Sequence, residues 1–281
     1  MQSRNPILNS SSTFNGSAAQ QYGHETYAAG GQGYQGYGQV PPRPESADPS
    51  TWTYPTGPSL AEPMTIDSVV ARTAVTLGLV ILTGALTWVF LPDNLTSTAW
   101  IGGALAGAGL GIWLSFMRSI NPSIVMLYAV AQGFFLGAAS EAFEQLYPGI
   151  VAQAVLGTVA AFVATLAAYK FFNIQVSDRF RKFVVIAGLG FFVLTFFDYI
   201  LYLFGNDIGF NDFGTLGLVF SVVGLALGVF YLILDFDMVE QGVRAGAPER
   251  ESWRAAFALT ATLIFIYIEL LRIIAILRGD N

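Results

Sequence analysis

The sequence predicts an all-α membrane protein, a seven-transmembrane-helix bundle that follows a disordered N-terminal tail. Three observations lead to this fold class. The 281 residues are 54% hydrophobic and only 11% charged, with a mean hydropathy of +0.56, whereas a soluble domain carries roughly 25% charged residues. Seven apolar runs of membrane-spanning length follow Pro63, and each break between them is short.

The first predicted domain, residues 1–62, is the tail. It is rich in Gly, Ser, Gln, Tyr and Pro, as in the stretch Gly30-Gly-Gln-Gly-Tyr-Gln-Gly-Tyr-Gly. Such a segment cannot bury enough apolar surface to offset the entropy lost on ordering, so we expect it to be disordered. Two interpretations of the tail stay open: an inert cytosolic tether, or a weak self-association element.

The second predicted domain, residues 63–281, contains the spanning helices. Crossing the bilayer takes about 20 residues at a rise of about 1.5 Å each, and Thr65 is a suitable N-cap for the first run. The apolar runs cover residues 69–91, 99–117, 123–146, 150–172, 183–204, 213–239 and 253–277. Because Pro- and Gly-containing breaks of a few residues separate them, consecutive helices are expected to be antiparallel neighbours.

Lys and Arg residues gather at alternate ends of these helices. Of the 13 basic residues, 11 fall on one side, and only Arg272 and Arg278 fall near the C-terminus. The positive-inside rule therefore predicts a multi-pass protein with a cytosolic N-terminus and an external C-terminus. The net charge of −6 and the absence of a basic face argue against nucleic acid as a partner, and the lipid bilayer is the expected one.

Regularly spaced small residues mark the expected helix–helix contacts. The sixth run carries such a stripe, followed one heptad later by Asp235; its members are Gly217, Ser221, Gly224 and Gly228. The fifth run places Asp198 on an interior face, and the last run places Thr262, Glu269 and Arg272 on one face. Three acids, Asp198, Asp235 and Glu269, are therefore predicted to point into the bundle.

An ionisable group at mid-bilayer costs at least about 2.5–3.5 kcal/mol, so it is usually kept for an ion pathway or a structural pair. We predict an ion-pathway role for Asp235. Asp198 and Glu269, with Arg272 one turn beyond Glu269, are predicted to form a buried charge cluster in the outer half. Asp237 lies about 200° around the helix from Asp235, and two interpretations stay open for it: a further pathway group or a solvated helix end.

Four segments of the chain form a recognisable combination: Tyr231-Leu-Ile-Leu-Asp235-Phe-Asp, Glu269-Leu-Leu-Arg272-Ile, Asn121-Pro-Ser and Gln132-Gly-Phe-Phe-Leu-Gly137. Together they resemble the Bax inhibitor-1 family in its bacterial, YccA-like branch. The order of seven helices and the predicted topology agree with that family. The resemblance covers about residues 64–281 and leaves out the tail.

The resemblance implies a pH-sensitive calcium leak channel of the bacterial inner (plasma) membrane, gated by an aspartate dyad shared by the last two helices. Two carboxylates within hydrogen-bonding distance share a proton, which makes gating respond to pH. Asp235 matches the first member of the dyad, whereas Thr262 occupies the position of the second. Glu269 is one heptad further, about 10 Å along the helix. Asp235, Thr262 and Asp237 are the predicted pathway and pH-sensing residues.

Two functions stay open. The first is an ion leak in which Asp235 is the candidate calcium-coordinating group, because hard cations prefer oxygen ligands. The second is a non-conducting regulator of a membrane-bound quality-control protease, with which YccA-like relatives are associated. An enzyme is not expected: the only histidine is His24, in the tail, and cysteine is absent, so zinc and Ser-His sites lack their residues. No cofactor is expected, and calcium enters as a transported ion.

Overall fold

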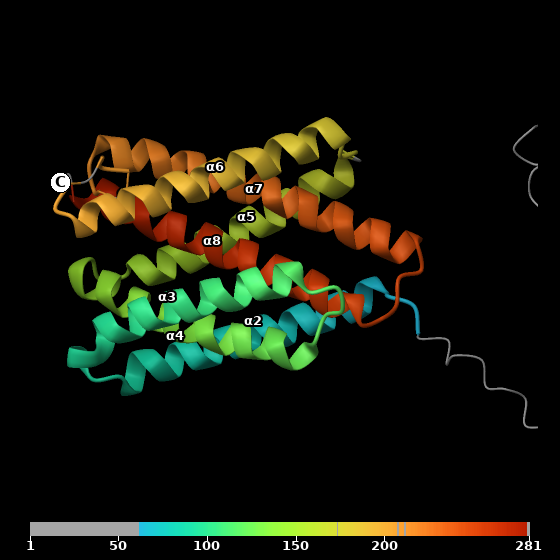
Figure 1. Cartoon of the computed structure of the whole chain (residues 1–281), viewed down its shortest axis with the longest axis horizontal. Coiled ribbons are helices and arrows are strands. Elements are labelled where there is room, and N and C mark those ends of the chain that lie inside the picture. Colours follow the sequence, from blue (N-terminus) through green and yellow to red (C-terminus); the bar gives the residue numbers. More distant parts are fainter. Residues whose placement is uncertain (1–61, 173, 207, 211, 280–281) are drawn as a thin grey trace, which may run out of the picture. The chain divides into compact units, whose positions relative to one another are not determined.

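The computed structural model describes residues 62–172, 174–206, 208–210 and 212–279. Among them, seven helices are long and apolar enough to cross a membrane, which confirms the predicted fold class (Figure 1). They are α2 (Ile66–Phe90), α3 (Asp93–Phe116), α4 (Pro122–Leu146), α5 (Ile150–Phe171), α6 (Asp178–Leu203), α7 (Thr215–Arg244) and α8 (Glu251–Gly279). The predicted tail lies outside the described residues except for Glu62, so its disorder and the division into two domains stay predictions.

Local sequence signals set the helix ends. Thr65 is the N-cap of α2 and forms a capping box with Ser68, in which each side chain accepts a hydrogen bond from the other residue's backbone N–H at 3.1 Å. Asn121 caps α4 in a similar way, and Pro122 occupies the first turn. The predicted start of α6, residue 183, is wrong by five residues, because the charged first turn from Asp178 is helical as well.

Helix α8 is the central element and packs against α7, α2, α5 and α4 (Figure 1). It runs parallel to α2, and two pairs of hydroxyl groups join these helices in register. Ser68 is hydrogen-bonded to Ser252 at 2.7 Å, and Thr76 is hydrogen-bonded to Thr260 at 2.8 Å. Both pairs lie in the half of the bundle where α2 and α8 begin.

The expectation that all consecutive helices are close neighbours is wrong. Within the described residues, α3 packs mainly against α4, and α6 packs mainly against α7, whereas α2 makes its main contacts with α4 and α8. Short loops fix the antiparallel direction of successive helices, but small residues and hydroxyl pairs decide which helices touch. The small-residue stripe of α4 meets α2, where a Cβ added at Gly84 would lie 3.4 Å from the Gly133 carbonyl oxygen.

The segment before α2 is paired with the α7–α8 loop. The Met64 N–H donates to the Ala247 carbonyl and the Glu249 N–H donates to the Glu62 carbonyl, both at 2.7 Å. Arg72 of α2 forms a salt bridge with Glu249 at 2.7 Å. The entry to the first helix and the α7–α8 loop therefore lie at the same end of the bundle, and both carry the basic residues that predict the cytosolic side.

The orientation in the membrane leads to a direct prediction. The C-terminus is expected on the external side, because the basic residues gather on the opposite side. A phosphatase fused after Asn281 should therefore be active, and a fluorescent protein fused there should be dark. A paired phosphatase and fluorescent-protein fusion at this position measures the location. A cytosolic signal at Asn281 would overturn the predicted topology.

Candidate functional site

The centre of the candidate site is a hydrogen bond between α7 and α8. The Thr262 hydroxyl donates to Oδ2 of Asp235 at 2.7 Å, and both residues are only 8% exposed. Asp235 lies nine residues before Arg244, the last residue of α7, which places it about 14 Å from that helix end. The structure therefore brings together the two residues that the resemblance assigns to the dyad positions.

The glycine stripe of α7 explains why these side chains meet. A Cβ added at Gly228 would lie 2.6 Å from Cγ1 of Ile266, so any larger residue would push α8 away. The predicted stripe residues of α7, Gly217, Ser221, Gly224 and Gly228, are all buried. Close approach of the two helices brings Asp235 within hydrogen-bonding reach of α8.

Asp235 has no cationic partner among the described residues. Its hydrogen-bond donor is a neutral hydroxyl, and the salt bridges found among the described residues do not include it. A buried carboxylate is normally paired with a cation or bound to a metal. The lack of a cationic partner distinguishes Asp235 from the other buried acid of α7.

Asp237 is that other acid, and its interpretation as a solvated helix end is wrong. It is 8% exposed, and its Oδ2 accepts hydrogen bonds from Arg181 of α6 at 2.6 Å and from Gln241 at 2.7 Å. Helix α6 covers this side of α7, so a residue on the face opposite Asp235 is still enclosed by the protein. Asp237 joins α6 to α7 through a salt bridge.

A second polar group occupies the other half of the bundle. Nη1 of Arg272 lies 3.7 Å from Oε2 of Glu269, and its Nη2 donates to the Phe210 carbonyl at 2.8 Å. Oδ1 of Asp198 accepts a hydrogen bond from the Ile208 N–H at 2.8 Å. Arg272 and Asp198 therefore both hold the loop between α6 and α7.

The Asp235–Thr262 pair and the group around Glu269 and Arg272 lie at different depths in the bundle. Asp235 of α7 faces Thr262, whereas Glu269 packs against Gly224, where an added Cβ would lie 2.8 Å from the Glu269 carboxyl carbon. Positions 224 and 235 are separated by about 16 Å along α7. Asp235 and Glu269 are thus not a dyad.

The oxygen atoms of the site limit how a cation can bind. Calcium takes six to eight oxygen ligands, but the part of the chain that the structure describes holds no cluster of three or more His, Cys, Asp or Glu residues. One carboxylate and one hydroxyl can meet a cation that keeps most of its water. This donor set suits transient contact rather than a resident metal ion.

Sequence reasoning missed one further buried acid. Glu141 of α4 is 7% exposed, and the hydroxyl of Thr96 on α3 approaches its carboxylate at 3.4 Å. The signal was present, because Glu141 continues the stripe of Gly133 and Gly137 at four-residue spacing. Arg181 was also missed as the partner of Asp237, since the sequence does not indicate that α6 covers that face of α7.

Comparison with known families agrees with this architecture. The sequence model of the family described as Bax inhibitor 1 like matches residues 5–279. The match begins within the predicted tail, so the likeness extends further than residues 64–281. A search of curated proteins gives no match. The family match covers nearly the whole chain, and seven helices can span a bilayer. The chain is therefore a multi-pass membrane protein of the Bax inhibitor 1 like family.

Proposed function

We propose that the protein is a cation leak of the membrane, with calcium as the expected ion and Asp235 as the group that meets it. The observation that supports this proposal is a buried carboxylate for which the described residues supply a single hydrogen-bond donor, the Thr262 hydroxyl. Keeping an acid at this depth costs at least about 2.5–3.5 kcal/mol. A structural acid such as Asp237 offsets this cost with an arginine, whereas Asp235 has no cation among its described contacts.

The Asp235–Thr262 hydrogen bond provides a simple way to control passage. A cation that binds the Asp235 carboxylate competes with the Thr262 hydroxyl for the same oxygen atoms. Proton binding removes the negative charge of Asp235, so the flux should depend on pH through this residue. Thr262 cannot share a proton as a second carboxylate would, and pH sensitivity here depends on one acid instead of a coupled pair.

Calcium flux into liposomes tests the proposal. Asp235→Asn keeps the size of the side chain but removes its charge. It should abolish the pH dependence of the flux and lower the flux by at least about tenfold, which corresponds to a lost interaction of at least about 1.4 kcal/mol. Asp237→Asn is the matched control, because Asp237 has the same 8% exposure two residues away but is paired with Arg181. Dye-loaded liposomes at several pH values give the measurement.

Two outcomes would contradict the proposal. Equal losses from Asp235→Asn and Asp237→Asn would show that α7 responds to any change in its packing. No flux from the wild-type protein would favour the non-conducting regulator.

Thr262→Asp is a gain-of-function variant, because it places a second carboxylate opposite Asp235. It should steepen the dependence of the flux on pH.

A further inference from the structure

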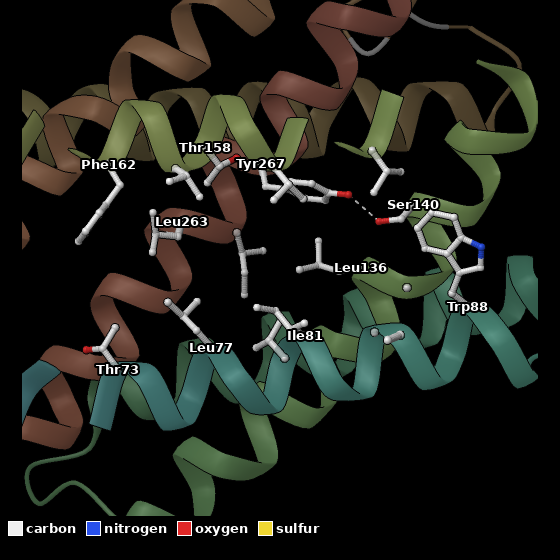
Figure 2. A pocket seen from close by; sticks show the side chains of 18 residues that line it. Thr73, Leu77, Ile81, Trp88, Leu136, Ser140, Thr158, Phe162, Leu263 and Tyr267 are labelled. Atoms are coloured by element: carbon white, nitrogen blue, oxygen red, sulfur yellow. Dashed lines mark hydrogen bonds between the residues drawn. The ribbon is translucent and has the colours of Figure 1, made fainter. Parts of the chain in front are cut away.

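A groove of about 470 Å³ runs between α2 and α5. Its walls are apolar side chains of α2 and α5, which do not pack closely against each other. Its floor is made by α8 and α4 (Figure 2). The wall residues include Leu77 and Ile81 of α2, and Leu263 and Tyr267 of α8 contribute to the floor.

The lining offers hydrocarbon contacts almost throughout. The Ser140 and Tyr267 hydroxyls are hydrogen-bonded to each other at 2.7 Å, as Figure 2 shows, and the Thr158 hydroxyl donates to the Ala154 carbonyl at 2.8 Å. These three hydroxyls therefore need no partner from an occupant, whereas the buried Thr73 hydroxyl at the other end of the groove has no hydrogen-bond partner among the described residues. Trp88 stands at one end of the groove, two residues from the end of α2, where a tryptophan suits the membrane interface.

The length and the lining of the groove indicate its occupant. Thr73 and Trp88 mark its ends on α2 and are 15 residues apart, which corresponds to about 22 Å. Over this length the lining is almost entirely apolar, and it belongs to helices that are long and apolar enough to span a membrane. A long apolar groove that opens toward hydrocarbon suits an extended hydrocarbon chain lying along α2.

We infer that the groove between α2 and α5 binds one lipid acyl chain, which enters from the membrane beside Trp88 and lies against Leu263 and Ile264 of α8. Both walls are exposed, apolar parts of membrane-spanning helices, so lipid has direct lateral access. The floor of the groove is mostly apolar and its Ser140 and Tyr267 hydroxyls are paired with each other, so hydrocarbon fits it better than water does.

Photolabelling in nanodiscs tests the inference. The probe is phosphatidylcholine with a diazirine at the end of one acyl chain, and peptide mass spectrometry locates the adducts. Ile264 is 7% exposed, so lipids that merely surround the protein cannot reach it, and adducts at Ile264 are diagnostic of a chain inside the groove. The wild-type protein should carry adducts there as well as on its outer surface.

Two tryptophan substitutions on α5 provide the matched comparison. Val159 lines the groove and Val163 does not, although their exposed fractions are 55% and 56%. Val159→Trp should fill the groove and remove the adducts from α8, whereas Val163→Trp should leave them unchanged. An absence of α8 adducts in the wild-type protein, or adducts that persist in Val159→Trp, would overturn the inference. A second copy of the chain that covered the groove would exclude the probe, so it too would appear as an absence of α8 adducts in the wild-type protein.

Discussion

Gly137→Ala is expected to destabilise the protein, although alanine is the better helix former. A Cβ added at Gly137 of α4 would lie 2.7 Å from Cβ of Thr87 and would collide with the backbone carbonyl of Gly84 on α2. Backbone atoms cannot rotate away, so the two helices would have to separate. Overpacking of this kind costs about 1–3 kcal/mol. Thermal unfolding in detergent should show a Tm lowered by several degrees.

Gly78→Ala on α2 is the control for this variant. An added Cβ at Gly78 meets no atom within 4 Å, so only helix propensity changes, and that change favours alanine by about 1 kcal/mol. The Tm of Gly78→Ala should equal or exceed that of the wild-type protein. If Gly137→Ala and Gly78→Ala had the same Tm, close contact between α2 and α4 would not contribute to stability.

The fold class could be predicted because it depends on the local composition of the chain. Low charge and apolar runs of membrane-spanning length are sufficient to place seven helices, and the Thr65 cap and the breaks at Pro92 and Pro122 place their ends within a few residues. Helix neighbours depend on which surfaces fit together. The sequence shows the Gly133 and Gly137 stripe, but it does not indicate that α2 rather than another helix packs against it.

The candidate site, too, could be predicted from the sequence only in part. Spacing predicted that Asp235 and Thr262 face the interior, and resemblance to the family predicted that they meet; the structure places them in a hydrogen bond. Their role in ion passage stays a prediction. The salt bridge between Asp237 and Arg181 could not be predicted, because it joins residues from two helices whose relative rotation is set by packing.

Arg272→Ala is expected to cause the largest loss of stability among the polar substitutions. The Arg272 side chain is 14% exposed and lies beside Glu269, whose side chain is 4% exposed and whose Oε2 has no hydrogen-bond partner among the described residues. Removing the guanidinium leaves this carboxylate buried without compensation, which costs about 3–5 kcal/mol. It also removes the hydrogen bond to the Phe210 carbonyl, which anchors the α6–α7 loop.

A second substitution separates the lost charge pair from lost packing. Glu269→Gln keeps the volume that fits against Gly224 but removes the negative charge, so Arg272→Ala with Glu269→Gln should melt at a higher temperature than Arg272→Ala alone. Arg278→Ala is the control on the same helix, because Arg278 also donates to a backbone carbonyl, that of Pro148, but in an exposed position. Its loss should cost only about 1 kcal/mol. If Arg272→Ala melts no lower than the double variant, Arg272 does not compensate the charge of Glu269, and Glu269 becomes a second candidate for contact with a permeating cation.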